Sequence, residues 1–217
     1  MDAAAFRREG ALRLPGCLDA ARVRALRALM TDGPGARLQD SALADLIAPA
    51  TAAARSLLGP GAFPVRAVLF DKTAEANWAV AWHQDRTIVV RERRKARGFG
   101  PWSRKAGLLH VAPPVEVLEG MATLRLHLDP CGPDNAPLKA AVGSHRLGRV
   151  PAGEAAARAL ALPVLVCLAD AGDVWAYSTL ILHASERAAA PSRRRVLQVD
   201  YAAADLPAGL QWAGIGS

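Results

Sequence analysis

Residues 80–90 read VAWHQDRTIVV and place two polar side chains, His83 and Asp85, inside an otherwise apolar run. Side chains two residues apart point to the same face of a β-strand. A histidine and a carboxylate aimed together beside Trp82 fit neither a plain core nor a plain solvent face. They form either an exposed, hydrogen-bonded pair at a strand edge or two ligands of a metal ion, and the rest of the chain bears on the choice.

Short apolar runs of the same kind follow one another from Phe63 onward. Turn residues such as Gly-Pro, Pro-Asp-Asn and Ala-Gly-Asp separate them. Many short strands bounded by turns are typical of a β-sandwich or barrel. The predicted strands are VRAVLF, NWAVAWH, RTIVV, ATLRLHLD, LKAAV, LPVLVCL, DVWAYS, LILHA and RVLQVDY.

The first third of the chain predicts helices instead. Asp19 can cap a helix that runs through Met30, and Asp40 or Ser41 can cap a second helix that ends at Gly59. We therefore predict a mainly β protein with flanking α-helices. The helical part covers about residues 1–60 and the β core about 63–202. Because no internal repeat or linker is found, residues 1–217 are expected to form a single domain.

Composition narrows the class of protein. An apolar fraction of 52% over 217 residues supplies enough material for a core. The three cysteines are odd in number and far apart, which indicates neither a disulfide framework nor a zinc site. The first residues carry no apolar leader, and no run approaches the length of a membrane span. We expect a cytoplasmic protein without a membrane partner.

The net charge of +7 is local. Residues 86–105 carry eight basic side chains and a single acidic one, so the rest of the chain is about neutral. Residues 91–105 would then form a loop after the strand that holds His83. That loop is either a solvated loop, a lid that attracts an anionic small-molecule substrate, or a surface for nucleic-acid phosphates. Since it lacks a known reading helix, no specific nucleic-acid partner is expected.

A third metal ligand is available at His183, which ends the apolar run LILHA. Two histidines and one carboxylate with open coordination positions form the facial triad of non-haem iron(II) oxygenases. Zinc is more often enclosed in a site with thiolates, and none is placed for it here. His83, Asp85 and His183 are therefore predicted to bind Fe(II), with O2 at an open position.

An oxygenase of this type needs an electron-donating co-substrate. If that co-substrate is 2-oxoglutarate, its far carboxylate needs a fixed cation, and the planar fork of arginine matches a carboxylate. Arg193, Arg194 and Arg195 all lie about eleven residues after His183. Alternation along a strand points Arg194 away from its two neighbours.

Together, these elements resemble the phytanoyl-CoA dioxygenase family. The resemblance rests on His83-x-Asp85, the later histidine in LILHAS, the arginine that opens a strand, and residues 134–148, DNAPLKAAVGSHRLG. It runs from about Phe6 to Tyr201. In residues 134–148 the sequence departs from the family pattern, because Ala136 replaces a glycine and Val142 replaces a proline.

The resemblance implies a double-stranded β-helix, a cupin-like jelly-roll barrel. It implies iron on His83, Asp85 and His183, and 2-oxoglutarate anchored by Arg194 with Ser185 beside its carboxylate. The implied reaction is hydroxylation of a substrate C–H bond with release of succinate and CO2. Asp85 favours hydroxylation, since related halogenases lack this carboxylate.

Two further polar residues are candidates for substrate contact. In ATLRLHLD, Arg125 and His127 alternate with leucines, so one face of the strand is polar. If the leucines pack against helices, the polar face points into the pocket; otherwise it meets solvent. The alternatives to an enzyme are a nucleic-acid-binding protein and a non-catalytic jelly-roll binding module. The sequence leaves open the substrate and the oligomeric state.

Overall fold

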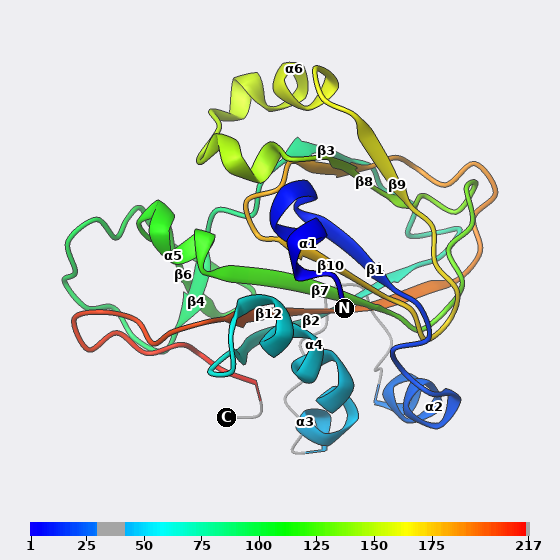
Figure 1. The fold of residues 1–217 in the computed structure, drawn as a ribbon, viewed down its shortest axis with the longest axis horizontal. Coiled ribbons are helices and arrows are strands. Elements are labelled where there is room, and N and C mark those ends of the chain that lie inside the picture. Colours follow the sequence, from blue (N-terminus) through cyan, green and yellow to red (C-terminus); the bar gives the residue numbers. More distant parts are fainter. Residues whose placement is uncertain (30–41, 216–217) are drawn as a thin grey trace.

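The computed structural model describes residues 1–29 and 42–215, and its centre is a five-stranded antiparallel sheet. The strand order in this major sheet is β1-β10-β7-β12-β2, so strands far apart in the sequence lie side by side (Figure 1). The strands are β1 (Ala11–Leu14), β10 (Val174–Ser178), β7 (Met121–His127), β12 (Arg194–Ala202) and β2 (Phe63–Lys72).

A second sheet faces the inner side of the first. Its strand order is β3-β11-β8-β9, and Figure 1 shows it stacked above the major sheet. The strands are β3 (Val80–His83), β11 (His183–Ser185), β8 (Leu138–Ala141) and β9 (Val164–Cys167). This pair of facing sheets confirms the predicted jelly-roll class, although the two sheets do not close into a continuous barrel.

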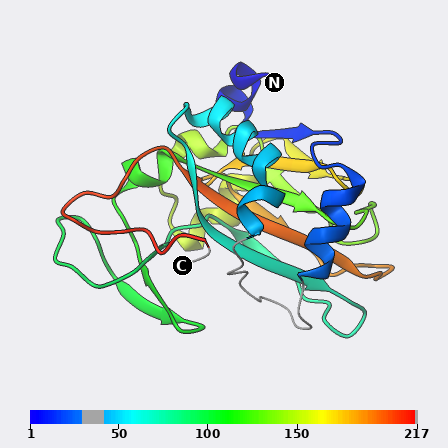
Figure 2. The ribbon, with the colours of Figure 1, turned by 90° about the horizontal axis from the view of Figure 1, so that it is seen from below.

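Helices cover the outer faces of both sheets. The major sheet is covered by α1 (Ala3–Glu9), α2 (Ala20–Ala28), α3 (Leu43–Leu46) and α4 (Ala48–Leu58). The last three lie below the sheet in Figure 1 and in front of it in Figure 2, the view from below. The minor sheet is covered by α6 (Ala155–Leu160). Leu124 and Leu126 of β7 point outward and are fully buried against α1–α4. The polar residues between them therefore face the other sheet.

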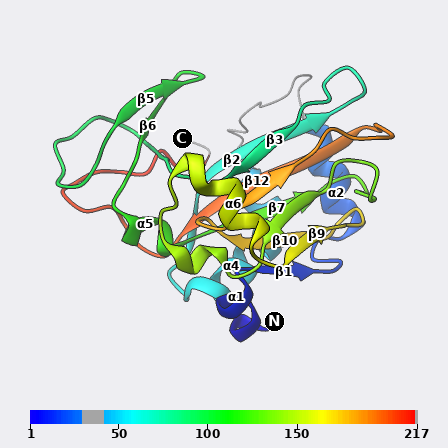
Figure 3. The same cartoon turned by 90° about the horizontal axis from the view of Figure 1, so that it is seen from above.

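A small third sheet lies to one side of the two main sheets (Figure 3). Its order is β4-β6-β5, and α5 (Val115–Glu119) packs beside it. The strands are β4 (Ile88–Val90), β5 (Trp102–Lys105) and β6 (Leu108–Val111). The basic segment 91–105 thus ends in a strand, and the prediction of a loop throughout was wrong there. Three half-buried side chains of the segment, Ala96, Phe99 and Trp102, pack against the apolar cluster formed by the third sheet, α5 and neighbouring residues.

Other differences concern β6, α5 and α6, which were not predicted, and the N-terminal part. All nine predicted strands are present, but β1 interrupts the part that was expected to be helical. Asp19 caps α2 as predicted, accepting a hydrogen bond from the Arg22 backbone N–H. The second predicted helix is divided into α3 and α4. Its proposed caps Asp40 and Ser41, and also Met30, lie outside the described residues. No described helix is long and apolar enough to cross a membrane.

Candidate active site

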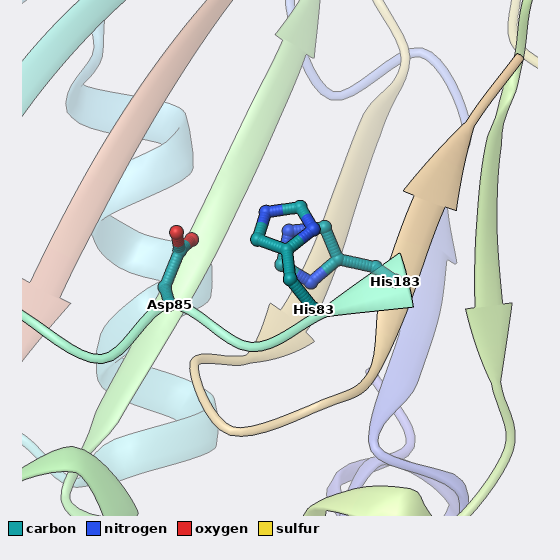
Figure 4. Close-up of side chains that lie close together, drawn as sticks. All are labelled: His83, Asp85 and His183. Carbon is teal, nitrogen blue, oxygen red and sulfur yellow. The ribbon is translucent and has the colours of Figure 1, made fainter. Parts of the chain in front are cut away.

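Three potential metal ligands meet at the inner face of the minor sheet (Figure 4). His83 ends β3, Asp85 follows in the irregular segment after it, and His183 begins β11. The pairing of the two strands sets His83 directly opposite His183. One ligand atom from each of the three residues lies within 4.8 Å of the others, and the imidazole centroids are 4.2 Å apart. The spacing suits one shared ion.

Backbone carbonyls determine which nitrogen of each imidazole is free. His83 Nδ1 lies 2.8 Å from the Ala81 carbonyl oxygen, and His183 Nδ1 lies 3.0 Å from that of Ile181. A carbonyl can only accept, so Nδ1 carries the proton and Nε2 keeps its lone pair. Metal-binding histidines are normally held in this way. Burial lowers the pKa of His183 to about 4, which keeps its imidazole neutral. The residues present therefore fit a divalent iron.

The residue between the two ligands fixes their backbone. Gln84 is buried and donates from Nε2 to the carbonyl oxygens of Gly148 and Leu180, at 2.8 and 2.7 Å. Its Oε1 accepts from the Val150 N–H at 2.9 Å. Three hydrogen bonds thus hold the segment of His83 and Asp85 in place.

A cavity of about 110 Å³ lies beside the three ligands, between the two sheets. Four of its lining side chains are basic, whereas the metal-ligand candidate Asp85 is the only acidic one among the described residues that line it. The lining residues are Arg66, Phe70, Lys72, Trp78, Val80, His83, Asp85, Arg125, Leu138, His183, Ala184, Ser185, Arg194 and Gln198.

The three consecutive arginines at the start of β12 point in alternating directions. Arg194 is 3% exposed and lines the cavity, where its Nη1 lies 3.6 Å from Cys131 Sγ and its Nε has no partner in the described part of the chain. Arg193 pairs with Asp71 and Arg195 with Asp129 on the opposite side. Of these three arginines, Arg194 is the one that faces the cavity, in agreement with the predicted alternation.

Of the other predicted site residues, Ser185 on β11 and Arg125 on β7 line the cavity and His127 does not. His127 also faces inward but is only 1% exposed and lies outside the cavity lining, so direct substrate contact by His127 is not supported. Burial, with the nearby charges of Arg125 and Arg194, lowers its pKa to about 3. None of residues 91–105 lines the cavity, and the lid stays a prediction.

Several cavity residues were missed by the sequence analysis. Lys72 lies opposite Arg194 in the β2–β12 pairing and donates to the Trp78 carbonyl oxygen at 2.7 Å. Burial, with the charges of Arg194 and Arg125, lowers its pKa to about 8. Arg66 and Gln198 also line the cavity. The alternation of side chains along β2 and β12 shows which face of the sheet these residues are on. Only the strand order shows that they lie around one cavity.

The two departures in residues 134–148 are local. Ala136 has a φ of 51°, in the left-handed region that a glycine occupies at less cost. Val142 donates its backbone N–H to the Pro163 carbonyl oxygen at 2.8 Å, a hydrogen bond that a proline could not make. Neither residue lines the cavity.

Known proteins share this fold. AviO1 from Streptomyces viridochromogenes Tue57 matches with a TM-score of 0.64 at 20% identity, over 95% of this chain and 94% of that one. SnoK, described as a non-heme alpha ketoglutarate dependent carbocyclase from nogalamycin biosynthesis, matches with a TM-score of 0.68 at 16% identity, over 94% and 83%. EctD from S. alaskensis, solved with 2-oxoglutarate and 5-hydroxyectoine, matches with a TM-score of 0.67 at 20% identity, over 92% and 74%.

The family assignment comes from the sequence itself. No curated protein matches the chain. The family model described as Phytanoyl-CoA dioxygenase (PhyH) matches residues 6–196, which is most of the chain. Its span includes the three clustered metal-ligand candidates and the arginine that opens β12. The chain therefore belongs to the phytanoyl-CoA dioxygenase family, and it is a non-haem iron dioxygenase that uses Fe(II), 2-oxoglutarate and O2.

Proposed function

We propose that this enzyme hydroxylates an aliphatic C–H bond of a small molecule, with His83, Asp85 and His183 as the iron ligands. The observation that carries the proposal is the meeting of these three side chains at the wall of a buried cavity, with Nε2 of both histidines free. In the overall reaction, substrate, 2-oxoglutarate and O2 give hydroxylated substrate, succinate and CO2. Iron, when bound, supplies the activation of oxygen.

The chain itself supplies the binding of the co-substrate. Arg194 would hold the far carboxylate of 2-oxoglutarate, because it is a buried cation without a carboxylate partner. Ser185 lines the same cavity and would add a hydroxyl donor. Lys72, opposite Arg194 across the β2–β12 pair, adds positive charge at this end of the cavity. Trp78 and Phe70 supply apolar wall that excludes water from the reacting atoms.

Asp85 supports hydroxylation as the outcome. A carboxylate ligand occupies the position that a halogenase leaves free for chloride. Proteins of the same fold are described as a carbocyclase and an epimerase, so the fold alone does not select a reaction. The rival functions, nucleic-acid binding or a non-catalytic binding module, are not favoured, since neither has a use for a buried His-Asp-His cluster beside an unpaired arginine.

The first test is spectroscopic. Anaerobic Fe(II) with 2-oxoglutarate should give a weak visible charge-transfer band, and His83→Ala, Asp85→Ala and His183→Ala should each lose it while remaining folded. His145→Ala is the matched control, because His145 is bonded to the Arg7 carbonyl oxygen away from the cavity and should keep the band. A band that survives all three ligand changes would refute the assignment. Incubation with a metabolite extract and O2 should then yield a product that is heavier by one oxygen.

A further inference from the structure

Arg125 is a buried cation without a counter-ion. Its side chain lines the cavity, and the residue is 7% exposed. Nη1 donates to Gln198 Oε1 at 3.0 Å, the guanidinium carbon lies 5.1 Å from the centre of the Phe70 ring, and Nε has no partner. Within the described part of the chain, no carboxylate lies at ion-pair distance from it. A buried charge in this state is costly unless something pairs with it.

Several arginines elsewhere in the fold have a carboxylate partner. Arg13 pairs with Asp173, Arg193 with Asp71 and Arg195 with Asp129. At the cavity wall, Arg66 lies 3.5 Å from the buried Asp200. Among the described residues, the two arginines that are buried are Arg125 and Arg194, and neither has a carboxylate at ion-pair distance. Both face the same cavity.

The cofactors do not supply the missing charge. Once Arg66 is paired with Asp200, the cavity keeps three cations, Lys72, Arg125 and Arg194, against Asp85. The two charges of Fe(II) and the two of 2-oxoglutarate cancel, so positive charge remains in excess. Lys72 can lose its proton, but a guanidinium stays charged at any working pH. With Arg194 assigned to the co-substrate, Arg125 is left over.

We infer that the substrate is a carboxylate and that Arg125 binds its carboxylate group. This inference rests on the proposed function. Arg125 lines the cavity and its Nε has no hydrogen-bond partner among the described residues, and a guanidinium binds a carboxylate through strong charge-assisted hydrogen bonds. A single unpaired guanidinium matches one negative charge. Arg125 is thereby a specificity-determining residue, which selects acids over neutral molecules of the same shape.

The test uses defined probes on the loaded enzyme without oxygen. The protein is first saturated with Fe(II) and 2-oxoglutarate, so that Arg194 is occupied. Propionate, butyrate, hexanoate and octanoate are then titrated in, followed by the matching primary amides and inorganic phosphate. Binding is followed by calorimetry and by perturbation of the charge-transfer band. At least one carboxylate should bind saturably, and about tenfold or more tighter than its amide, as expected for a charge-assisted pair in a buried site.

Variants assign that preference to one residue. Arg125→Gln should bring carboxylate binding down to the level of the amide, and Arg125→Lys should restore part of it. Arg193→Gln is the matched control on the other side of β12 and should behave as the wild type. Should Arg125→Gln fail to fold, the wild-type comparison of acid with amide still tests the carboxylate preference, and Arg125→Lys tests its assignment to this residue.

Four outcomes would overturn the inference. The first is that the amides bind as tightly as their acids. The second is that phosphate binds more tightly than every carboxylate. An acid preference that survives in Arg125→Gln would also exclude the assignment, and so would the absence of saturable carboxylate binding in the millimolar range. Each of these leaves the proposed function intact if the charge-transfer band is present. A wild-type protein without the band would overturn both.

Discussion

Hydrogen bonds to the backbone and the alternation of side chains along a strand orient the polar side chains of this cavity. His83 and His183 present Nε2 because a carbonyl two residues earlier accepts the Nδ1 proton of each. Arg194 faces the cavity because the side chains of a strand alternate and its two neighbours are held by Asp71 and Asp129 outside. The same alternation shows why a change at one of the three arginines should not resemble a change at the next.

Arg194→Met should raise the concentration of 2-oxoglutarate that gives half of the charge-transfer band by about ten- to hundredfold. The reason is that losing a charge-assisted pair in a buried cavity costs about 1.5–3 kcal/mol. Arg193→Met removes the same charge from a side chain that is 49% exposed and should change the titration little. If 2-oxoglutarate affinity falls equally in Arg194→Met and Arg193→Met, net positive charge and not a specific ion pair holds the co-substrate.

At the scale of elements, the irregular segment after β3 is held as firmly as a strand. Gln84 connects it to Leu180, just before β11, and to the backbone of Gly148 and Val150. The two strands that carry the histidines are therefore linked both by their own pairing and by this amide. The three metal-ligand candidates are thus tied to the same part of the minor sheet.

Gln84→Ala should weaken Fe(II) binding by about tenfold, because groups that orient metal ligands commonly contribute 10–100-fold to metal affinity. Stability should also fall, by about 1–3 kcal/mol, because the Val150 N–H and two carbonyls lose their buried partner. Iron titration at fixed 2-oxoglutarate and urea unfolding measure the two effects. Gln211→Ala, an exposed amide, is the control. Unchanged iron affinity with lowered stability would limit Gln84 to a structural role.

At the scale of the whole molecule, the basic charge and the cavity are separate features. Residues 91–105 run from the end of β4 through β5, within the small third-sheet region that Figures 1 and 3 show to one side of the two main sheets. Arg93 lies over the Trp102 ring, and Arg94 pairs with Glu92, so part of this charge is engaged within the segment. The positive charge that lines the cavity is a separate set of side chains, Arg66, Lys72, Arg125 and Arg194.

Replacing Arg93, Arg94 and Lys95 by serine should therefore leave the charge-transfer band and the 2-oxoglutarate titration unchanged. Exposed charges are screened within about 8–10 Å at physiological salt, and surface substitutions usually change stability by about 0.5 kcal/mol or less. Binding to a heparin column should weaken, as three exposed positive charges are lost. A marked loss of 2-oxoglutarate binding in the triple variant would show that the segment does support the cavity.

The sequence alone determined those features that depend on local periodicity and residue chemistry. Alternation made Arg194 oppose its neighbours and put Arg125 on the face opposite the leucines of β7. It also predicted that His83 and Asp85 point the same way, and they do meet, although Asp85 lies beyond the end of β3. Three strands were missed: β1 and β6 are only four residues long, and Arg104 and Lys105 hide an apolar pattern in β5. Lys72 and Gln198 join the site through pairings between β2, β12 and β7, strands separated by dozens of residues. Only the tertiary structure decided which cations remain without a partner, since that depends on what each side chain meets across the two sheets.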